Sequence, residues 1–246
     1  MYSFVIPLNR QRKDRLIGCI KNIKHVFGQY INDYEIIVVE QQDEPFKLGQ
    51  LRNVGFSLCN FGITIFVDVD MRFCGPYIHF KHLLNKYKAP LVCWQYISQV
   101  DEDEKYKLTE RTGEWLQKGK GWGGVNAFTT KQFLDCSGYS NLLAGWGKED
   151  DLIAYRSGMR RLKDQEILHV YHERKKERNR YLKHNTKILE LTKQNQIFHY
   201  LDGWQQTIAD ISELYVYKNI RKYQVSNIRV DKDKYIKLYN EMLKIA

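Results

Sequence analysis

Two carboxylates stand directly after an apolar stretch in the first third of the chain. Asp68-Val69-Asp70 follows the run Ile63-Thr64-Ile65-Phe66-Val67, and α/β sheets bind ligands at the carboxyl ends of such strands. Side chains at i and i+2 share one side of an extended chain. If the chain bends there, one carboxylate can bind Mg²⁺ or Mn²⁺ while the other reaches a ribose or sugar. An isolated Asp-x-Asp pair also caps turns, so further motifs must support this interpretation.

A pair of histidines lies about a hundred residues further on, in His169-Val170-Tyr171-His172. Two imidazoles three residues apart can converge on one metal ion from a turn or a distorted strand end. Imidazole suits Mn²⁺, Fe²⁺ or Zn²⁺ better than Mg²⁺. Taken alone, such a pair is more often exposed or satisfied in a core, and no Cys-rich spacing indicates structural zinc.

Acidic residues and an aromatic ring are combined in Gly145-Trp146-Gly147-Lys148-Glu149-Asp150-Asp151. A Trp between glycines offers a flat surface on a hinge, and sugars stack on such rings. The acids come at an expected helix start, where the helix dipole favours ionised carboxylates. An acidic first turn with no further role explains Asp151 well, but explains Glu149 and Asp150 less well.

Glycines also concentrate in Gly121-Trp122-Gly123-Gly124. Without a Cβ, the backbone of such a segment can approach a ligand closely. A tight turn before a helix is an equally good interpretation of this segment.

The elements that must position these motifs follow from the hydrophobic pattern. It predicts strands at 4–8, 34–40, 63–67, 91–95, 166–171, 214–217 and 223–230, and helices at 12–27, 48–58, 149–157 and 232–244. Alternating strands and helices imply an α/β protein with a Rossmann-like, mostly parallel central sheet and helices on both faces.

Length and composition favour one domain spanning residues 1–246, since 43% of the residues are hydrophobic and no linker-like run occurs. The net charge of +10 permits partners that carry phosphate, including a nucleotide, nucleic acid or an anionic membrane. The 5 cysteines are odd in number and lack a Cys-x-x-Cys pair, which is typical of reduced thiols. With neither a signal-peptide pattern nor 18 consecutive apolar residues, we expect a cytoplasmic protein, or one peripheral to the inner face of the membrane.

Taken in order, the motifs resemble the β-1,4-galactosyltransferase family and its relatives, among them chondroitin-type polymerases and polypeptide N-acetylgalactosaminyltransferases. The resemblance spans nearly the whole chain, and the Asp-Val-Asp motif combined with Gly-Trp-Gly-x-Glu-Asp-Asp is its most specific part. It begins at residues 6–11, which are similar to the family's IPFRNRQ, and continues at 46–56, where Leu51 and Asn53-Val54-Gly55-Phe56 match FNRAKLLNVGF. Further matches lie at 66–70, 123–125, 131–133, 138–139, 145–151, 172–176 and 202–203.

This resemblance implies a GT-A fold, with a nucleotide-sugar half at about 1–100 and an acceptor and metal half at about 101–246. It implies Asp70, His169 and His172 as ligands of Mn²⁺ or Mg²⁺, and Asp150 as the general base with Glu149 supporting substrate binding. Residues 171–189 would form a long loop that closes after the donor binds, and Trp146 would lie on a small flexible loop. The implied donor-binding residues are Pro7, Asn9, Arg10, Phe46, Arg52, Asp68, Val69, Gly121, Trp122, Gly123 and Gly124. The implied acceptor-binding residues are Trp146, Gly147, Glu149, Asp150 and Asp151.

The chain departs from the family pattern at positions that bear on metal and donor. His169 stands where the well-known animal galactosyl enzymes have Met. A His at this position should be the better ligand for divalent metals in general. Gly121 stands where the family has a donor-gating Tyr, and Trp122 replaces a Phe, so an N-acetylated donor such as UDP-GalNAc joins UDP-Gal as a candidate. A family Arg near the diphosphate falls on Leu48, and Arg52 or Arg10 would have to substitute.

The resemblance implies an inverting transfer of Gal or GalNAc from a UDP-sugar to a glycan or glycolipid acceptor, in bacterial or viral surface glycan synthesis. An alternative is a nucleotidyltransferase that forms sugar nucleotides. It would need a Gly-rich loop with Lys or Arg after the first strand, where residues 8–12 read Leu-Asn-Arg-Gln-Arg. A nucleic-acid-binding module would draw on the basic run at 174–183, but no helix-turn-helix, zinc-finger or RNP pattern occurs. We therefore expect no nucleic-acid partner.

Overall fold

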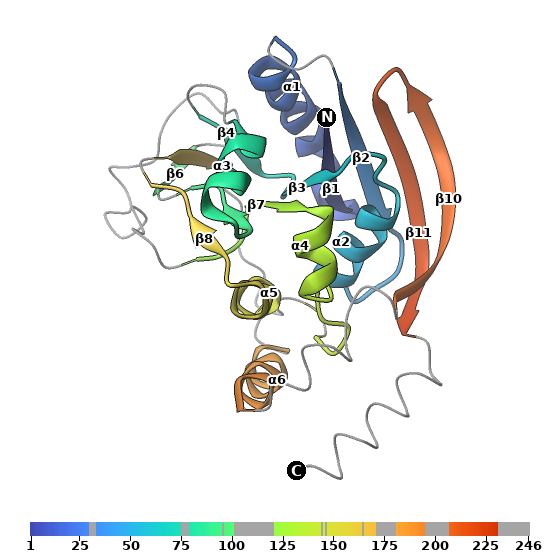
Figure 1. Cartoon of the computed structure of the whole chain (residues 1–246). Coiled ribbons are helices and arrows are strands. Elements are labelled where there is room, and N and C mark those ends of the chain that lie inside the picture. Colours follow the sequence, from blue (N-terminus) through green and yellow to red (C-terminus); the bar gives the residue numbers. More distant parts are fainter. Residues whose placement is uncertain are drawn as a thin grey trace.

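A computed structural model describes residues 1–29, 33–74, 79–94, 96–100, 121–143, 145, 147–163, 165–170, 181–194 and 207–230. Its main sheet has eight strands in the order β10-β11-β2-β1-β3-β7-β5-β8 (Figure 1). These strands are β1 (Tyr2–Asn9), β2 (Tyr34–Gln41), β3 (Ile63–Val67), β5 (Leu91–Val92), β7 (Val125–Thr129), β8 (Arg160–Arg161), β10 (Thr207–Tyr217) and β11 (Ile220–Val230). A second sheet has three strands in the order β4-β9-β6, namely β4 (Met71–Phe73), β9 (Glu166–Val170) and β6 (Tyr96–Val100).

The centre of the main sheet is parallel. Strand β1 pairs in parallel with β2 and β3, and β11 pairs in parallel with β2. Antiparallel pairs occur at β10–β11, β3–β7 and β5–β7. The inner strands are buried along almost their whole length, which is why they read as continuous apolar runs rather than alternating ones. The predicted mostly parallel central sheet with flanking helices is confirmed.

Helices cover both faces of this sheet. They are the 3₁₀ segment η1 (Arg10–Arg15) and the helices α1 (Leu16–Phe27), α2 (Leu48–Ser57), α3 (Phe80–Tyr87), α4 (Thr130–Asp135), α5 (Glu149–Ser157) and α6 (Leu182–Gln194). Phe4 of β1 pairs in register with Ile65 of β3, so these two side chains point to the same face of the sheet. Phe66, the residue after Ile65, therefore points to the opposite face.

Two aromatic clusters form the core on these opposite faces. The ring centroid of Phe4 lies 4.9 Å from that of Phe27 of α1, which lies 5.8 Å from that of Phe80 of α3. On the other face the ring centroid of Phe66 lies 5.4 Å from that of Phe133 of α4, which lies 4.2 Å from that of Phe56 of α2. Helices α1 and α3 therefore cover one face, and α2 and α4 cover the other.

Several predicted boundaries need correction. The strand predicted at 91–95 ends as β5 at Val92. The elements β4, β6, β7, α3 and α4 were not predicted. The late strands are longer than predicted and form one hairpin of β10 and β11. Residues 182–189, predicted within a long loop, belong to α6, because Leu189 and its neighbours pack against Leu143 and Leu152. The basic run at 174–180 and the helix predicted at 232–244 lie outside the described residues.

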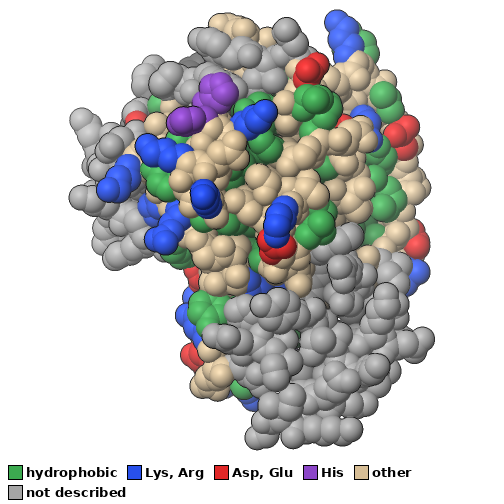
Figure 2. Space-filling model, viewed as in Figure 1, with side chains coloured by type: hydrophobic (Ala, Val, Ile, Leu, Met, Phe, Trp, Pro, Cys, Tyr) green, Lys and Arg blue, Asp and Glu red, His purple; other side chains and the backbone are tan. Residues whose placement is uncertain are grey.

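Strand β10 forms the outer edge of the main sheet. Its exposed apolar side chains are those of Ile211, Leu214, Tyr215, Val216 and Tyr217, and hydrophobic side chains run along the corresponding right edge in Figure 2. Among the described helices, none combines the length and the apolar character needed to cross a bilayer.

Candidate active site

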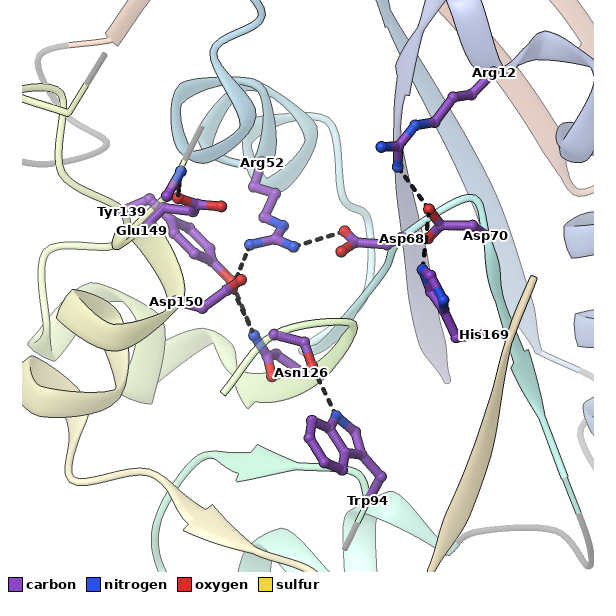
Figure 3. Close-up of polar contacts among 12 residues, drawn as sticks. Arg12, Arg52, Asp68, Asp70, Trp94, Asn126, Tyr139, Glu149, Asp150 and His169 are labelled. Carbon is purple, nitrogen blue, oxygen red and sulfur yellow. Dashed lines mark hydrogen bonds and ion pairs between the residues drawn. The ribbon is translucent and has the colours of Figure 1, made fainter. Parts of the chain in front are cut away.

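The chain turns immediately after β3, and this turn separates the two carboxylates of the Asp-Val-Asp motif. The Asp68 amide donates to the Gly124 carbonyl at 2.8 Å, and the Met71 amide donates to the Asp68 carbonyl at 2.9 Å. Asp68 and Asp70 consequently face different partners (Figure 3). The two carboxylates would share a side only on an extended chain, so the structure follows the bent alternative.

Asp70 meets a histidine from the second sheet. Register pairs Met71 of β4 with His169 of β9, and the Val170 amide donates to the Asp70 carbonyl at 2.8 Å. His169 Nε2 thereby lies 3.6 Å from Asp70 Oδ2. The pairing of β4 with β9 thus joins two of the three implied metal ligands, while His172 lies outside the described residues.

This pair fits a divalent cation in its chemistry. A carboxylate and an imidazole are a donor set that suits Mn²⁺, and within the described part of the chain no third His, Cys, Asp or Glu completes a group. The Asp70 side chain is 3% exposed, and Arg12 Nη1 lies 2.6 Å from its Oδ2. A buried carboxylate needs a compensating positive charge, and here the Arg12 guanidinium supplies one at the place where a cation would bind.

Arg52 of α2 joins the other motif carboxylate to the acidic cluster. Its Nη2 donates to Asp68 Oδ1 and its Nη1 donates to Asp150 Oδ1, each at 2.6 Å. The side chain is 1% exposed, and the guanidinium carbon lies 5.0 Å from the centroid of the Tyr139 ring. Burial disfavours its charge, but Asp150 and the other nearby acids outweigh burial and hold the pKa of Arg52 well above its usual value.

The burial of Arg52 changes its predicted role. The resemblance implied that Arg52 or Arg10 stands near the diphosphate of the donor, and in the structure both terminal nitrogens of Arg52 donate to carboxylates. Burial raises the pKa of Asp68, an effect that Arg52 opposes and that the neighbouring Asp150 strengthens. The guanidinium of Arg52 therefore offsets the electrostatic repulsion between the carboxylates of Asp68 and Asp150.

Asp150 is the member of the acidic triplet that enters this cluster. Its Oδ1 accepts from Arg52 and, at 3.4 Å, from Asn126 Nδ2. Its Oδ2 faces Gly123 so closely that a Cβ there would lie 2.2 Å away. Its side chain is 20% exposed, so a reacting hydroxyl can reach this carboxylate.

The other two acids of the triplet point elsewhere, because consecutive helical residues project about 100° apart. Glu149 Oε2 accepts from the Gly147 amide at 2.7 Å. Burial, with a further contribution from Asp150, raises the pKa of Glu149 to about 8. Asp151 pairs with Lys148 at 2.9 Å, in agreement with the simpler interpretation of an acidic first turn. Glu149 thus fixes the loop before α5.

Aromatic side chains hold the glycine segment at 121–124 in place. Trp94 Nε1 donates to the Gly123 carbonyl at 2.7 Å. The guanidinium carbon of Arg161 lies 4.6 Å from the Trp94 ring and 4.9 Å from the Trp122 ring. Gly124 adopts φ +88, a conformation that L side chains rarely adopt. This segment therefore holds a defined position between the Asp68 turn and Asp150.

The remaining predicted donor residues lie around the end of β1. Pro7 is buried in β1 in register with Val39, and Val69 is 3% exposed. Asn9 ends β1, Arg10 donates to Gln42, and Phe46 packs against the core. Trp146 lies outside the described residues.

Sequence reasoning missed four residues of this site. Arg12 stood only in the segment after the first strand, Tyr139 stood only in a matched motif, and Asn126 was given no role. Trp94 was included only in a predicted strand. A buried aromatic after a strand and a basic turn close to an acidic motif are weak signals, and only the tertiary contacts give them meaning.

Comparisons with known proteins point in one direction. A family model described as "N-terminal domain of galactosyltransferase" matches residues 110–185. Human β-1,4-galactosyltransferase 4 is 29% identical over 168 residues, which cover 65% of this chain and 43% of that protein. A β-N-acetyl-D-glucosaminide β-1,4-N-acetylglucosaminyl-transferase of Lymnaea stagnalis is 30% identical over 171 residues, which cover 63% of this chain and 29% of that protein. The chain thus spans less than half the length of these curated relatives.

Solved structures agree on the fold. The catalytic domain of Drosophila β1,4-galactosyltransferase 7, in a complex with xylobiose, has a TM-score of 0.65 and 17% sequence identity, and the match covers 94% of each chain. A mutant of the same enzyme in complex with manganese, UDP-Gal and xylobiose has a TM-score of 0.59 and 18% identity, again over 94% of each chain. The predicted GT-A fold is therefore confirmed.

Proposed function

Because this chain is a relative of the β-1,4-galactosyltransferases, we propose that it is a metal-dependent glycosyltransferase that moves a sugar from a UDP-sugar to an acceptor hydroxyl with inversion. One observation carries this proposal. Segments near residues 68–70, 150 and 169 lie far apart in the sequence, yet Asp68 and Asp150 share Arg52, and Asp70 meets His169 just beyond Asp68 (Figure 3).

The roles of the residues follow from what each side chain can do. Asp70 and His169, together with His172, would hold Mn²⁺ or Mg²⁺. When bound, such a cation neutralises the charge of a leaving diphosphate. Asp68 orients the donor beside this site, and Asp150 accepts the proton of the attacking hydroxyl as general base. Leaving group and base stand on opposite sides of the anomeric carbon, so one displacement converts an α-linked donor into a β-linked product.

We further propose that the donor is UDP-Gal or UDP-GalNAc. The solved neighbour was crystallised with manganese and UDP-Gal, while the Lymnaea relative is named for the transfer of an N-acetylated sugar, which in that protein is N-acetylglucosamine and not N-acetylgalactosamine. Gly121 lacks a side chain, but a Cβ there would lie 3.4 Å from Trp94 Cη2. The indole therefore takes part of the room that a larger residue at 121 would need. We keep both donors as candidates, because the missing side chain of Gly121 leaves space for an N-acetyl group and the Trp94 indole limits that space.

The acceptor is a sugar hydroxyl of a glycan or glycolipid in this proposal. That it belongs to a bacterial or viral surface glycan, and that the protein is cytoplasmic or peripheral to the inner membrane face, stay predictions.

A UDP-release assay tests the proposed function. The protein is incubated with UDP-Gal, UDP-GalNAc, UDP-Glc and UDP-GlcNAc in turn, each with Mn²⁺, with Mg²⁺ or with EDTA, over a panel of acceptor sugars. We expect acceptor-stimulated UDP release with at least one of the first two donors, and its loss in EDTA. Equal release in metal-free buffer, or no release from any donor, would contradict the proposal.

A further inference from the structure

Arg52 is the residue on which the carboxylates of the site depend for their arrangement. We propose that Arg52 is a positioning residue that holds Asp150 and Asp68 in one fixed geometry and leaves Asp150 Oδ2 to accept the proton. This inference rests on the proposed function for its catalytic half, and on contacts alone for its structural half.

The geometry supports a bridge rather than a single ion pair. One guanidinium donates to Asp68 at the end of β3 and to Asp150 at the start of α5, both at 2.6 Å. A planar fork of fixed donors sets the direction of both carboxylates at once, which a Lys ammonium on a flexible stem cannot do. The donor-side acid and the base therefore take their relative position from one side chain.

The scaffold around Arg52 restricts its movement. The adjacent Asn53 holds Tyr139 through a pair of hydrogen bonds: its Nδ2 donates to the Tyr139 carbonyl at 2.9 Å, and its Oδ1 accepts from the Tyr139 amide at 3.0 Å. The Tyr139 ring then lies against the guanidinium at 5.0 Å. Helix α2, which carries Arg52, is buried from Leu48 to Phe56. A buried cation supported in this way is a fixed reference point for both acids.

The two oxygens of Asp150 are consequently distinguished. Oδ1 accepts from Arg52 and from Asn126, whereas Oδ2 lies over Gly123. Because Arg52 occupies Oδ1, the geometry assigns proton acceptance to Oδ2. Both terminal nitrogens of Arg52 donate to these two carboxylates, so in this proposal Arg52 acts through Asp150 and Asp68.

The first experiment separates positioning from general stability. Arg52→Lys keeps the charge but not the bridge, so we expect kcat for transfer to fall about 100-fold, the loss typical of a reacting group displaced by 1 Å. We expect the Mn²⁺ concentration for half-maximal transfer to change less than about threefold, because Arg52 donates to Asp150 and Asp68 and not to Asp70 or His169. Arg221→Lys is the matched control, since Arg221 of β11 is a part-buried Arg that pairs with Glu35 of β2, outside the site. It should lower the urea midpoint while kcat stays within about twofold.

The second experiment needs no activity. Asp150→Asn should lower the urea midpoint of the wild type, because Arg52 loses a partner. In the Arg52→Met background the same change should raise the midpoint, because it removes a carboxylate that has lost its cation. If Arg52→Met does not fold, Arg52→Lys takes its place, and Asp150→Asn should then lower the midpoint less than in the wild type.

The outcomes distinguish this inference from the proposed function. Normal kcat in Arg52→Lys, or equal midpoint shifts in both backgrounds, would overturn the positioning role. If the wild type releases no UDP while the midpoint shift still depends on Arg52, the proposed function fails and the structural half survives.

Discussion

Gly123 is the position where a single added carbon should disturb the base and little else. In a Gly123→Ala variant the new Cβ would lie 2.2 Å from Asp150 Oδ2 and 2.9 Å from its carboxyl carbon. The glycine segment cannot easily retreat, because the Gly123 carbonyl accepts from Trp94 at 2.7 Å and the Gly124 carbonyl accepts from the Asp68 amide at 2.8 Å. The carboxylate must therefore move.

The size of the effect follows from this distance. To reach ordinary contact, Oδ2 must retreat by about 1 Å, and this shift of the carboxylate disturbs the hydrogen bond that Oδ1 accepts from Arg52; a displacement of that size can slow a reaction about 100-fold. We therefore expect kcat to fall about 100-fold, equivalent to about 2.7 kcal/mol in the activation free energy. The free energy of unfolding should change by less than about 2 kcal/mol, since the partner that moves is the end of a side chain.

Initial rates of UDP release at saturating donor, together with urea unfolding, measure both quantities. Gly62→Ala is a neutral control, because nothing lies within 4 Å of its Cβ position. Gly55→Ala is a control for steric destabilisation, since its Cβ would lie 2.3 Å from Val5 Cγ1 in the core. It should destabilise the fold by about 1–3 kcal/mol, and because Gly55 lies on α2 with Arg52, kcat per folded molecule should fall, but by less than in Gly123→Ala. Transfer by Gly123→Ala within threefold of the wild type would refute this reasoning.

Four further predictions concern the remaining chemistry. Asp150→Asn should keep the Kd for UDP and lower transfer by about 10²–10⁴-fold; normal transfer would show that another group is the base. EDTA should abolish transfer, and His169→Ala should raise the Mn²⁺ concentration for half-maximal transfer at least tenfold, since it removes one donor near Asp70; an unchanged Mn²⁺ requirement would exclude His169 as a ligand. Burial raises the pKa of Glu149 in the folded protein from the usual 4.5 to about 8. Between these two pH values the folded state binds more protons than the unfolded state, so the free energy of unfolding falls as pH rises. Glu149→Gln should therefore weaken the fall in urea midpoint between pH 5 and pH 8.5, and parallel profiles for the two proteins would contradict the buried environment of this acid.

Much of the fold could be predicted because its central elements carry strong local signals. Strands β1, β2 and β3 contain apolar runs at 4–8, 36–39 and 65–67, and α5 runs from Glu149 to Ser157, the predicted limits. Strand β4 escaped prediction because its 3 residues show no period, and β7 because the polar Asn126 and Thr129 interrupt its apolar pattern. Pairing with distant strands gives both their conformation.

The site was predictable in its acids and not in its cations. Asp68, Asp70 and Asp150 stand in motifs at ends of elements, where chemistry is expected. Arg52 lies within a helix whose residues from Leu48 to Phe56 are all buried, and no local pattern indicates that an Arg there bridges two carboxylates. Its role depends on α2 meeting α5, which is a tertiary contact.

The configuration of the product tests the central claim most directly. Proton NMR of a reaction with Mn²⁺, an acceptor sugar and UDP-Gal or UDP-GalNAc would follow the anomeric signal of the transferred sugar, with Asp150→Asn in parallel. We predict a β-linked product from the α-linked donor with the wild type, and none with the variant over the same time. An α-linked product, or equal product from both proteins, would contradict a single displacement assisted by Asp150.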